Sequence, residues 1–190
     1  MIRTLPILVA PSILLWSCVC AGEANWLDDL NPANWNKPGM TIPAAPVNQR
    51  DTVLACEGYT RPPQFLEDRN VRERGWNLMG PYQGGWNVLV IAAAAGYDGM
   101  CRPLQYQYFV FVRGAFAGTL SPGLMDSRTD GALNKVSFHS SGENLDAQYL
   151  RYTQSDALCC PSRTVSVVFE IDRVNRLVRP KVATTSPNRP

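Results

Sequence analysis

The chain has 190 residues, a formal net charge of +2, 45% hydrophobic residues and 18% charged residues. The length is that of about one domain, and the small net charge excludes strong electrostatic attraction to nucleic acid or to acidic membranes. The composition also excludes a coiled coil, a long disordered tail and a polytopic membrane protein, and the single histidine excludes a His-rich metal site.

The first residues have the pattern of a secretory signal peptide. Arg3 supplies a positive charge, and an uncharged run rich in Leu, Ile and Val follows and closes with small residues. A retained membrane anchor is the alternative, because the run is close to the length needed to span a bilayer. Pro6 and Pro11 interrupt the helical pattern and favour the signal peptide. We therefore predict a signal peptide over 1–21 and an exported protein, periplasmic or extracellular.

Two processing sites compete at the end of this segment. Ala21 ends a short run of small or modest residues that suits ordinary signal peptidase, whereas 15–18 resembles a bacterial lipobox in which Cys18 is acylated. Trp16 is bulky for a lipobox. Cleavage after Ala21 leaves an even set of cysteines, which favours the soluble form on local residues alone.

The next elements, in chain order, are a linker, a short strand and a helix. Proline, asparagine and tryptophan recur over 22–50, which predicts an extended linker or stalk. A short strand is predicted over 51–56, and the charged segment 64–74 is the one fair candidate for a helix.

From Trp76 onward the pattern is typical of β-structure. The run 104–113 alternates between two faces, and 164–171 does the same. Close turns separate the runs, so we predict a mainly β domain over 51–182, with a β-rich α+β fold as the variant. Its expected form is a single antiparallel meander sheet or a partly curled barrel, followed by a polar tail over 183–190. The predicted strands cover 86–95, 104–113, 115–120, 133–139, 145–152, 164–171 and 176–178.

Cysteines of an exported domain usually form disulfides. We expect Cys56 and Cys101 each to bridge one of the adjacent Cys159 and Cys160, because a bridge between neighbouring cysteines distorts the backbone. The Cys159–Cys160 bridge is the alternative pairing. No Cys-x-x-Cys and no zinc-ligand spacing is present, so the four cysteines are interpreted as structural staples.

Four segments in order carry a family resemblance. DGMCRPL at 98–104, FVFVRGAFAGTLSP at 109–122, SRTDGAL at 127–133 and RYTQSDALCCPSR at 151–163 resemble the LppP/LprE family of exported bacterial lipoproteins, and cyanobacterial-type members in particular. The resemblance implies an exported, often lipid-anchored envelope protein, and it strengthens the case for acylation at Cys18. It transfers no catalytic residue.

Catalytic and ion-binding patterns are weak. A serine hydrolase would need His139, one of Ser121, Ser137 and Ser162, and one of Asp126, Asp130 and Asp156, but no Gly-x-Ser-x-Gly elbow occurs. The segment 126–131 resembles the start of a calcium loop, but Arg128 occupies a ligand position, which favours a turn. We predict no catalytic, cofactor-binding or metal-binding residue.

Aromatic residues in loop-like surroundings are the one hint of a binding surface. Exposed tryptophan and tyrosine can stack on sugars or anchor a protein partner, although packing against the sheet is the commoner role. The candidate binding residues are Trp35, Trp76, Tyr82 and Trp86. Trp26 lies in the same kind of sequence surroundings.

The leading hypothesis is a non-enzymatic envelope domain that has a binding or structural role. Its partner would be an envelope protein or a glycan, with no nucleic acid, and with membrane contact only through the signal segment or a lipid anchor. The alternatives are a redox-responsive protein that uses Cys159 and Cys160, and a cryptic hydrolase centred on His139.

Overall fold

The computed structural model describes residues 25–47 and 50–188. The predicted signal peptide over 1–21, including Cys18, lies outside these residues. The described elements are η1 (Trp26–Asp28), α1 (Arg50–Ala55), η2 (Glu57–Tyr59), α2 (Leu66–Glu73), β1 (Asn77–Gly85), β2 (Val88–Tyr97), β3 (Pro103–Val112), β4 (Ala115–Thr119), β5 (Ala132–Phe138), β6 (Asn144–Arg151), β7 (Arg163–Asp172) and β8 (Leu177–Pro187).

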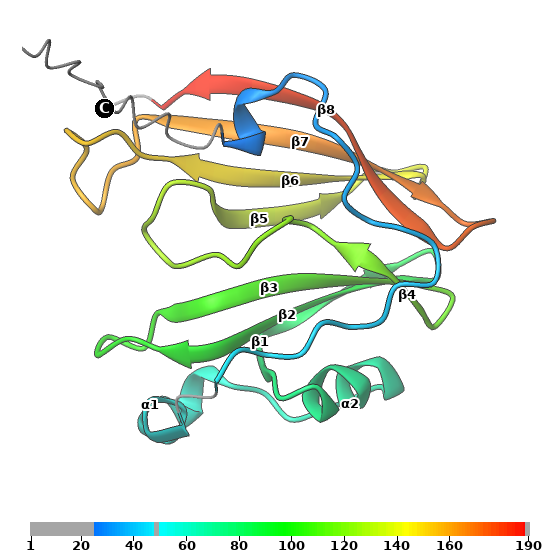
Figure 1. Cartoon of the computed structure of the whole chain (residues 1–190), viewed down its shortest axis with the longest axis horizontal. Helices are drawn as coiled ribbons and strands as arrows, with labels where there is room; N and C mark the ends of the chain where they lie inside the picture. Colours follow the sequence, from blue (N-terminus) through cyan, green and yellow to red (C-terminus); the bar gives the residue numbers. More distant parts are fainter. Residues whose placement is uncertain (1–24, 48–49, 189–190) are drawn as a thin grey trace, which may run out of the picture.

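The strands form two antiparallel four-stranded sheets. Each sheet is a meander, with the order β1-β2-β3-β4 in one and β5-β6-β7-β8 in the other. Figure 1 shows the two sheets as separate layers, with both α-helices beyond the first sheet. The predicted mainly β, antiparallel meander is confirmed, but the single sheet is not. The chain leaves the first sheet after Thr119 and crosses the gap through a long connection at 120–131, where the strand pattern stops.

Sheet β1–β4 is covered on both faces, which explains why every residue of β2 is buried. Val88, Val90 and Val110 face the second sheet, whereas Ile91 and Phe109 belong to a separate cluster on the opposite face. Val71 of α2 joins this second cluster, as does Ile42 from the N-terminal segment. A strand buried on both faces has no polar alternation, as the apolar run WNVLVIAAAA suggests.

The core between the sheets contains two buried tyrosines whose hydroxyls are satisfied by loop and strand carbonyls. Tyr106 Oη donates to the carbonyl of Leu133 at 3.1 Å, and Tyr149 Oη donates to the carbonyl of Leu120. Burial raises the pKa of both phenols, so both are donors at neutral pH. Each bond links an element of one sheet to the entry or exit of the 120–131 connection.

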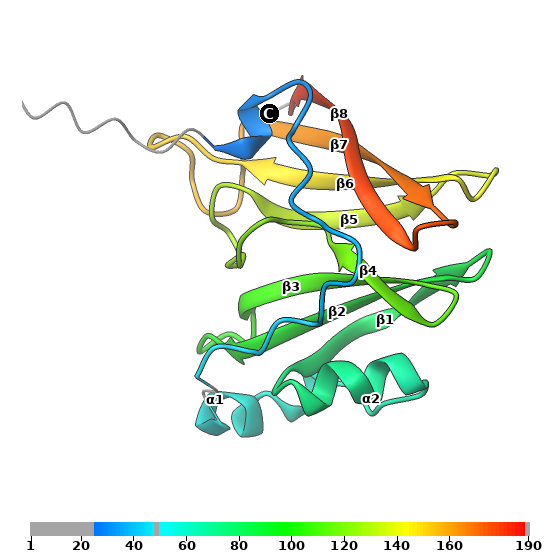
Figure 2. The ribbon, with the colours of Figure 1, turned by 45° about the vertical axis from the view of Figure 1, so that its right-hand side comes forward.

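Residues 25–47 form a strap that runs along one side of both sheets (Figures 1 and 2). Ala183 N donates to Leu30 O at 2.9 Å near β8, and Trp76 Nε1 donates to Pro43 O at 2.8 Å behind the first sheet. The predicted linker or stalk over 22–50 is therefore wrong for this part of the chain. The asparagines and tryptophans supply polar groups that bond to backbone, and the prolines keep the strap extended.

Asn36 joins the facing edges of the two sheets. Its side chain is buried, with Oδ1 accepting from Thr119 N at 2.9 Å and Nδ2 donating to Thr119 O and Val178 O, both at 3.0 Å. The carboxamide thus acts on β4 as another strand's peptide group would. Gly118 has a φ of +133°, and a Cβ added there would lie 2.2 Å from Asn36 Cγ. Glycine is required at this position for both reasons.

Three other local predictions are settled by the structure. The helix expected over 64–74 is confirmed as α2. The strand expected over 51–56 is wrong, because these residues contribute α1, on which Thr52 Oγ1 accepts from Tyr97 N at 3.2 Å. The polar tail over 183–190 is also wrong up to Pro187, since β8 continues beside β7 and Ala183 is buried.

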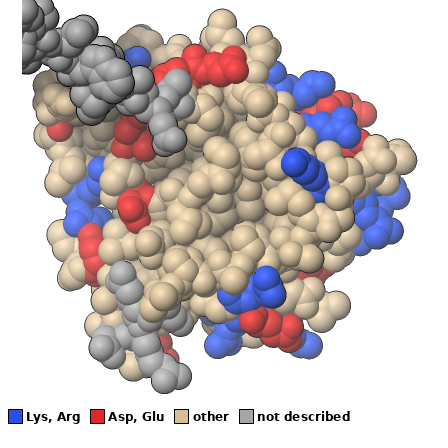
Figure 3. Space-filling view, in the orientation of Figure 1, with Lys and Arg blue, Asp and Glu red and all other residues tan. Residues whose placement is uncertain are grey.

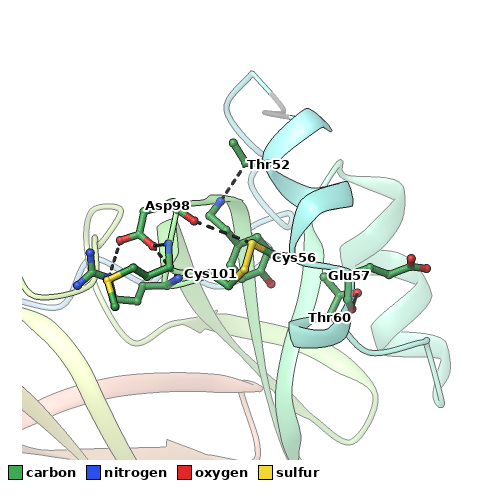
Figure 4. Close-up of a disulfide and its surroundings, with 9 residues drawn as sticks. Thr52, Cys56, Glu57, Thr60, Asp98 and Cys101 are labelled. Carbon is green, nitrogen blue, oxygen red and sulfur yellow. Dashed lines mark hydrogen bonds and ion pairs between the residues drawn. A yellow bond between two sulfur atoms is a disulfide. The ribbon is translucent and has the colours of Figure 1, made fainter.

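The disulfide pairing differs from the favoured prediction. Cys56 pairs with Cys101, with a Cα–Cα distance of 5.4 Å, and Cys159 pairs with Cys160. Figure 4 shows the first bridge fastening the end of α1 beside the β2–β3 turn. Cys159 and Cys160 lie in the β6–β7 connection of the second sheet, whereas Cys56 and Cys101 lie beside the first sheet.

Replacing Asn36 with alanine should destabilise the protein by about 3 kcal/mol, because the buried Thr119 N–H loses its acceptor and the buried Val178 carbonyl loses this donor. Urea unfolding followed by tryptophan fluorescence measures the change. Asn31→Ala, at an exposed position of the same strap, is the matched control and should change stability by less than about 0.5 kcal/mol. Equal stability of the two variants would contradict the assignment.

Candidate functional site

A broad concave surface lies beside η1. Two adjoining cavities of about 570 and 790 Å³ share Asn25, Trp26 and Pro122. One wall is the start of the strap and the other is the 120–131 connection. We call this surface the Trp26 groove. It is lined by Asn25, Trp26, Asp28, Asp29, Pro32, Ala33, Asn34, Trp35, Ser121, Pro122, Gly123, Leu124, Met125, Asp126, Thr129, Asp130 and Gly131.

Local structure holds Trp26 in a fixed position. Asn25 caps η1, with its side chain accepting from Leu27 N at 3.1 Å, and the buried Leu27 anchors the turn in the core. The centroid of the Trp26 ring lies 4.9 Å from the ring centroid of Trp35 and 5.1 Å from that of Tyr149, and both pairs are T-shaped. Such T-shaped contacts favour one ring orientation. Trp35 is held in turn by hydrogen bonds from Nε1 to Thr119.

Arg151 ties the two walls together. Its Nε donates to Asp130 at 2.8 Å and its Nη1 donates to Asp28 at 2.8 Å, while its side chain is only 7% exposed. Burial opposes the charge of Arg151, but the hydrogen bonds that it donates to Asp130 and Asp28 outweigh this effect and raise the pKa of Arg151. Asp130 also accepts from Asn25 Nδ2 and from Tyr152 N. The groove is therefore built before any ligand arrives.

Three carboxylates of the groove keep an oxygen free. Asp28, Asp29 and Asp126 each accept hydrogen bonds on Oδ1, and within the described ranges Oδ2 of each makes none. Figure 3 shows acidic side chains over the upper left of this face, next to a broad uncharged surface. A carboxylate only accepts hydrogen bonds, so the groove combines an aromatic floor with acceptors for hydroxyl or ammonium donors.

The predicted binding aromatics do not come together. Trp35 lines the groove, whereas Trp76 is 2% exposed and packs on Phe109, so the prediction of Trp76 as a surface aromatic is wrong. Tyr82 packs against Phe65, and Trp86 lies near Phe138. The assignments of Trp35, Tyr82 and Trp86 as binding residues stay predictions. Sequence reasoning missed Asp28 and Asp29, although the run NWLDD brings two acids next to Trp26.

The residues of the alternative hydrolase are dispersed. His139 Nε2 lies 2.8 Å from Oδ2 of Asp146, a residue outside the predicted triad. Asp126 and Asp130 line the groove, and Asp156 orders the β6–β7 connection. Ser121 is buried and accepts from Gly123 N, so it is no free nucleophile. Ser137 is the cross-strand partner of Asp146, but no hydrogen bond joins Ser137 to His139 within the described part of the chain.

Residues 25–47 and 50–188 contain neither a metal-binding cluster nor a membrane-spanning helix. No cluster of three or more His, Cys, Asp or Glu side chains is arranged to hold a metal ion. The helices among these residues are too short or too polar to cross a membrane. The 126–131 segment forms a turn in which Thr129 Oγ1 donates to Asp126 O at 2.7 Å, as the sequence predicts.

Comparison with known proteins shows that part of the chain is similar to one protein family. The LppP/LprE lipoprotein model matches residues 86–173. The resemblance predicted from the four motifs is thereby confirmed, over a stretch that runs from the turn before β2 to the end of β7. No curated protein and no solved structure matches the chain.

The resemblance to the LppP/LprE lipoproteins indicates an envelope-associated protein. The matched stretch contains the 120–131 wall of the Trp26 groove, Arg151 and the Cys159–Cys160 bridge. It does not contain the strap, which supplies Trp26, Trp35 and the two exposed acids. The part of the groove that carries the aromatic floor is thus outside the family match.

Replacing Arg151 with methionine should destabilise the protein by about 2 kcal/mol, because it removes the nearly buried cation that Asp28 and Asp130 share across the groove. Chemical denaturation measures the change. Arg179→Met is the control, since Arg179 is 38% exposed and pairs with Asp172 alone. It should cost less than about 0.5 kcal/mol. Similar losses for both variants would show that Arg151 does not bridge the walls.

Proposed function

We propose that the chain is an exported, non-enzymatic envelope domain that binds a neutral glycan in the Trp26 groove. The observation that carries the proposal is an aromatic and proline floor next to carboxylates with free acceptor oxygens. The apolar C–H face of a sugar ring packs on an aromatic ring, while its hydroxyls donate to acceptors at the rim.

The charge and the size of the Trp26 groove restrict the class of glycan that it can bind. Asp29 and Asp126 have no cationic partner among the residues that the structure describes, so the groove repels acidic sugars and favours neutral or amino sugars. Cavities of about 570 and 790 Å³ lie within the range of small-molecule sites and suit an oligosaccharide of a few units. The rigid positions of Trp26 and Arg151 reduce the entropy lost on binding.

The test is isothermal titration with neutral tetrasaccharides of glucose and of N-acetylglucosamine. Trp26→Ala should weaken binding about ten-fold or more, because it removes the stacking surface. Trp86→Ala is the matched control, since Trp86 is 49% exposed and lies outside the groove. Asp29→Asn should also weaken binding and leaves the core untouched, since Asp29 is exposed.

The results of this titration distinguish a glycan ligand from a protein partner. Failure of all neutral tetrasaccharides to bind contradicts the glycan proposal. Binding of an oligolysine peptide that Asp29→Asn abolishes, with no sugar binding, would assign the groove to a basic protein segment instead.

The exposed Cys159–Cys160 pair supports a second candidate function, thiol–disulfide exchange in the envelope. Both cysteines are exposed, whereas Cys56 of the other bridge is 4% exposed. A bridge between adjacent residues closes almost no chain loop, so it contributes little stability through the unfolded state. It is therefore poorly explained as a staple, and an exposed, small-ring disulfide is open to attack by a thiolate.

The loop around the pair is held by other contacts. Asp156 accepts from Thr153 N at 2.9 Å, from Thr153 Oγ1 and from Ser162 N, and these bonds hold its pKa far below the ordinary range. Tyr152 Oη donates to Leu158 O at 3.2 Å, and Asn188 Nδ2 donates to Pro161 O at 2.7 Å. The bridge can therefore open without unfolding the loop.

The reaction is an exchange with a dithiol. A partner thiolate attacks one sulfur of the pair, forms a mixed disulfide and releases the other sulfur as a thiolate. The partner's second thiolate then attacks the partner's own sulfur in the mixed disulfide and releases the second cysteine of the pair. The partner is thereby oxidised to a disulfide, and Cys159 and Cys160 are reduced to thiols.

Titration with dithiothreitol, followed by alkylation and mass mapping, should reduce Cys159–Cys160 at about ten-fold lower reductant than Cys56–Cys101. Reduction of this pair alone should leave the unfolding midpoint nearly unchanged. A Cys159→Ala/Cys160→Ala variant is the control for the midpoint. Simultaneous reduction of both bridges would eliminate the exchange function.

A further inference from the structure

One buried hydroxyl in the core region lacks a partner. Tyr97 ends β2 and is 1% exposed, yet its Oη makes no hydrogen bond to the described residues. Buried hydroxyls are normally bonded, as those of Tyr106 and Tyr149 are in the same protein. Burial raises the pKa of Tyr97 to about 12, so the phenol keeps its proton at neutral pH and is available as a donor.

Tyr97 lines a cleft of about 230 Å³ that is separate from the Trp26 groove. The walls include Tyr59, Met79, Tyr108, Cys101 and Pro103, and none of the described residues that line the cleft is charged. Met79 is nearly buried, whereas Tyr59 is 62% exposed and lies where solvent can enter. The surroundings are apolar apart from the phenols and Gln83.

The wall that carries Tyr97 is rigid. The Cys56–Cys101 bridge links α1 to the β2–β3 turn, and Tyr97 N donates to Thr52 Oγ1 on α1 (Figure 4). Asp98 closes the same turn, accepting from Met100 N and Arg102 N at 2.9 Å. The backbone that carries Tyr97 is therefore fastened on both sides of the residue.

We propose that this cleft binds a small, neutral, largely apolar organic molecule, about the size of a substituted ring, whose oxygen accepts a hydrogen bond from Tyr97 Oη. The volume exceeds the roughly 150 Å³ of a dry protein cavity that holds benzene. The absence of charge in the walls excludes an ionic ligand, because desolvation would not be compensated. The orphan donor selects a carbonyl or ether oxygen over a pure hydrocarbon.

The test uses two probes of the same shape, acetophenone and α-methylstyrene, which differ by an oxygen in place of a methylene group. Dissociation constants are measured by NMR titration of the full chain. Tyr97→Phe should weaken acetophenone binding about five-fold or more, and it should leave α-methylstyrene binding unchanged or tighter. Tyr82→Phe, outside the cleft, and Trp26→Ala, in the groove, should change neither constant.

Each outcome decides the proposal. No saturable binding of either probe to the native protein would overturn the cleft as a site. Equal effects of Tyr97→Phe on both probes would overturn the role of the hydroxyl. α-Methylstyrene binding shows that the cleft is intact in the variant. A large loss of stability in Tyr97→Phe would show that a bound water already satisfies the hydroxyl, and this too would overturn the assignment.

Discussion

A buried carboxamide holds the two sheets of this protein together at their open side. Asn36 pairs with the peptide group of Thr119 on β4 and with the carbonyl of Val178 on β8, so it bridges the outer edges of two strands that are paired on one side only within their sheets. An unpaired edge inside a protein is costly, because each peptide group loses its bond to water. The close approach also requires glycine at 118. The strap is therefore part of the fold and not an appendage.

The same strap builds the candidate binding site. Trp35 lies one residue before Asn36 and is fixed by Thr119, and Trp26 packs on Trp35. Arg151 then couples η1 to the 120–131 connection through Asp28 and Asp130. The segment that closes the sandwich and the segment that presents the aromatic floor are thus one structure. A change in sheet packing would alter the groove directly.

The two disulfides have different physical consequences. Cys56–Cys101 joins residues 45 positions apart, fastens α1 to the first sheet and shapes the wall of the Tyr97 cleft. Cys159–Cys160 joins neighbours on an exposed loop that Asp156 and Asn188 already order. The first restricts the unfolded chain, whereas the second leaves its entropy nearly unchanged. One bridge therefore acts as a structural staple, whereas the other contributes little to the stability of the fold.

The sequence by itself determined the β-class of the fold, most strand positions, helix α2 and the family resemblance, because alternation, turn residues and local motifs are properties of short segments. Only the tertiary structure decided that the strands divide into two sheets, that 25–47 is a strap and that Trp76 is buried while Trp26 lines a groove. The cysteine partners were likewise decided in space. These outcomes depend on contacts between residues far apart in the chain, such as Asn36 with Val178, and no local pattern encodes such contacts.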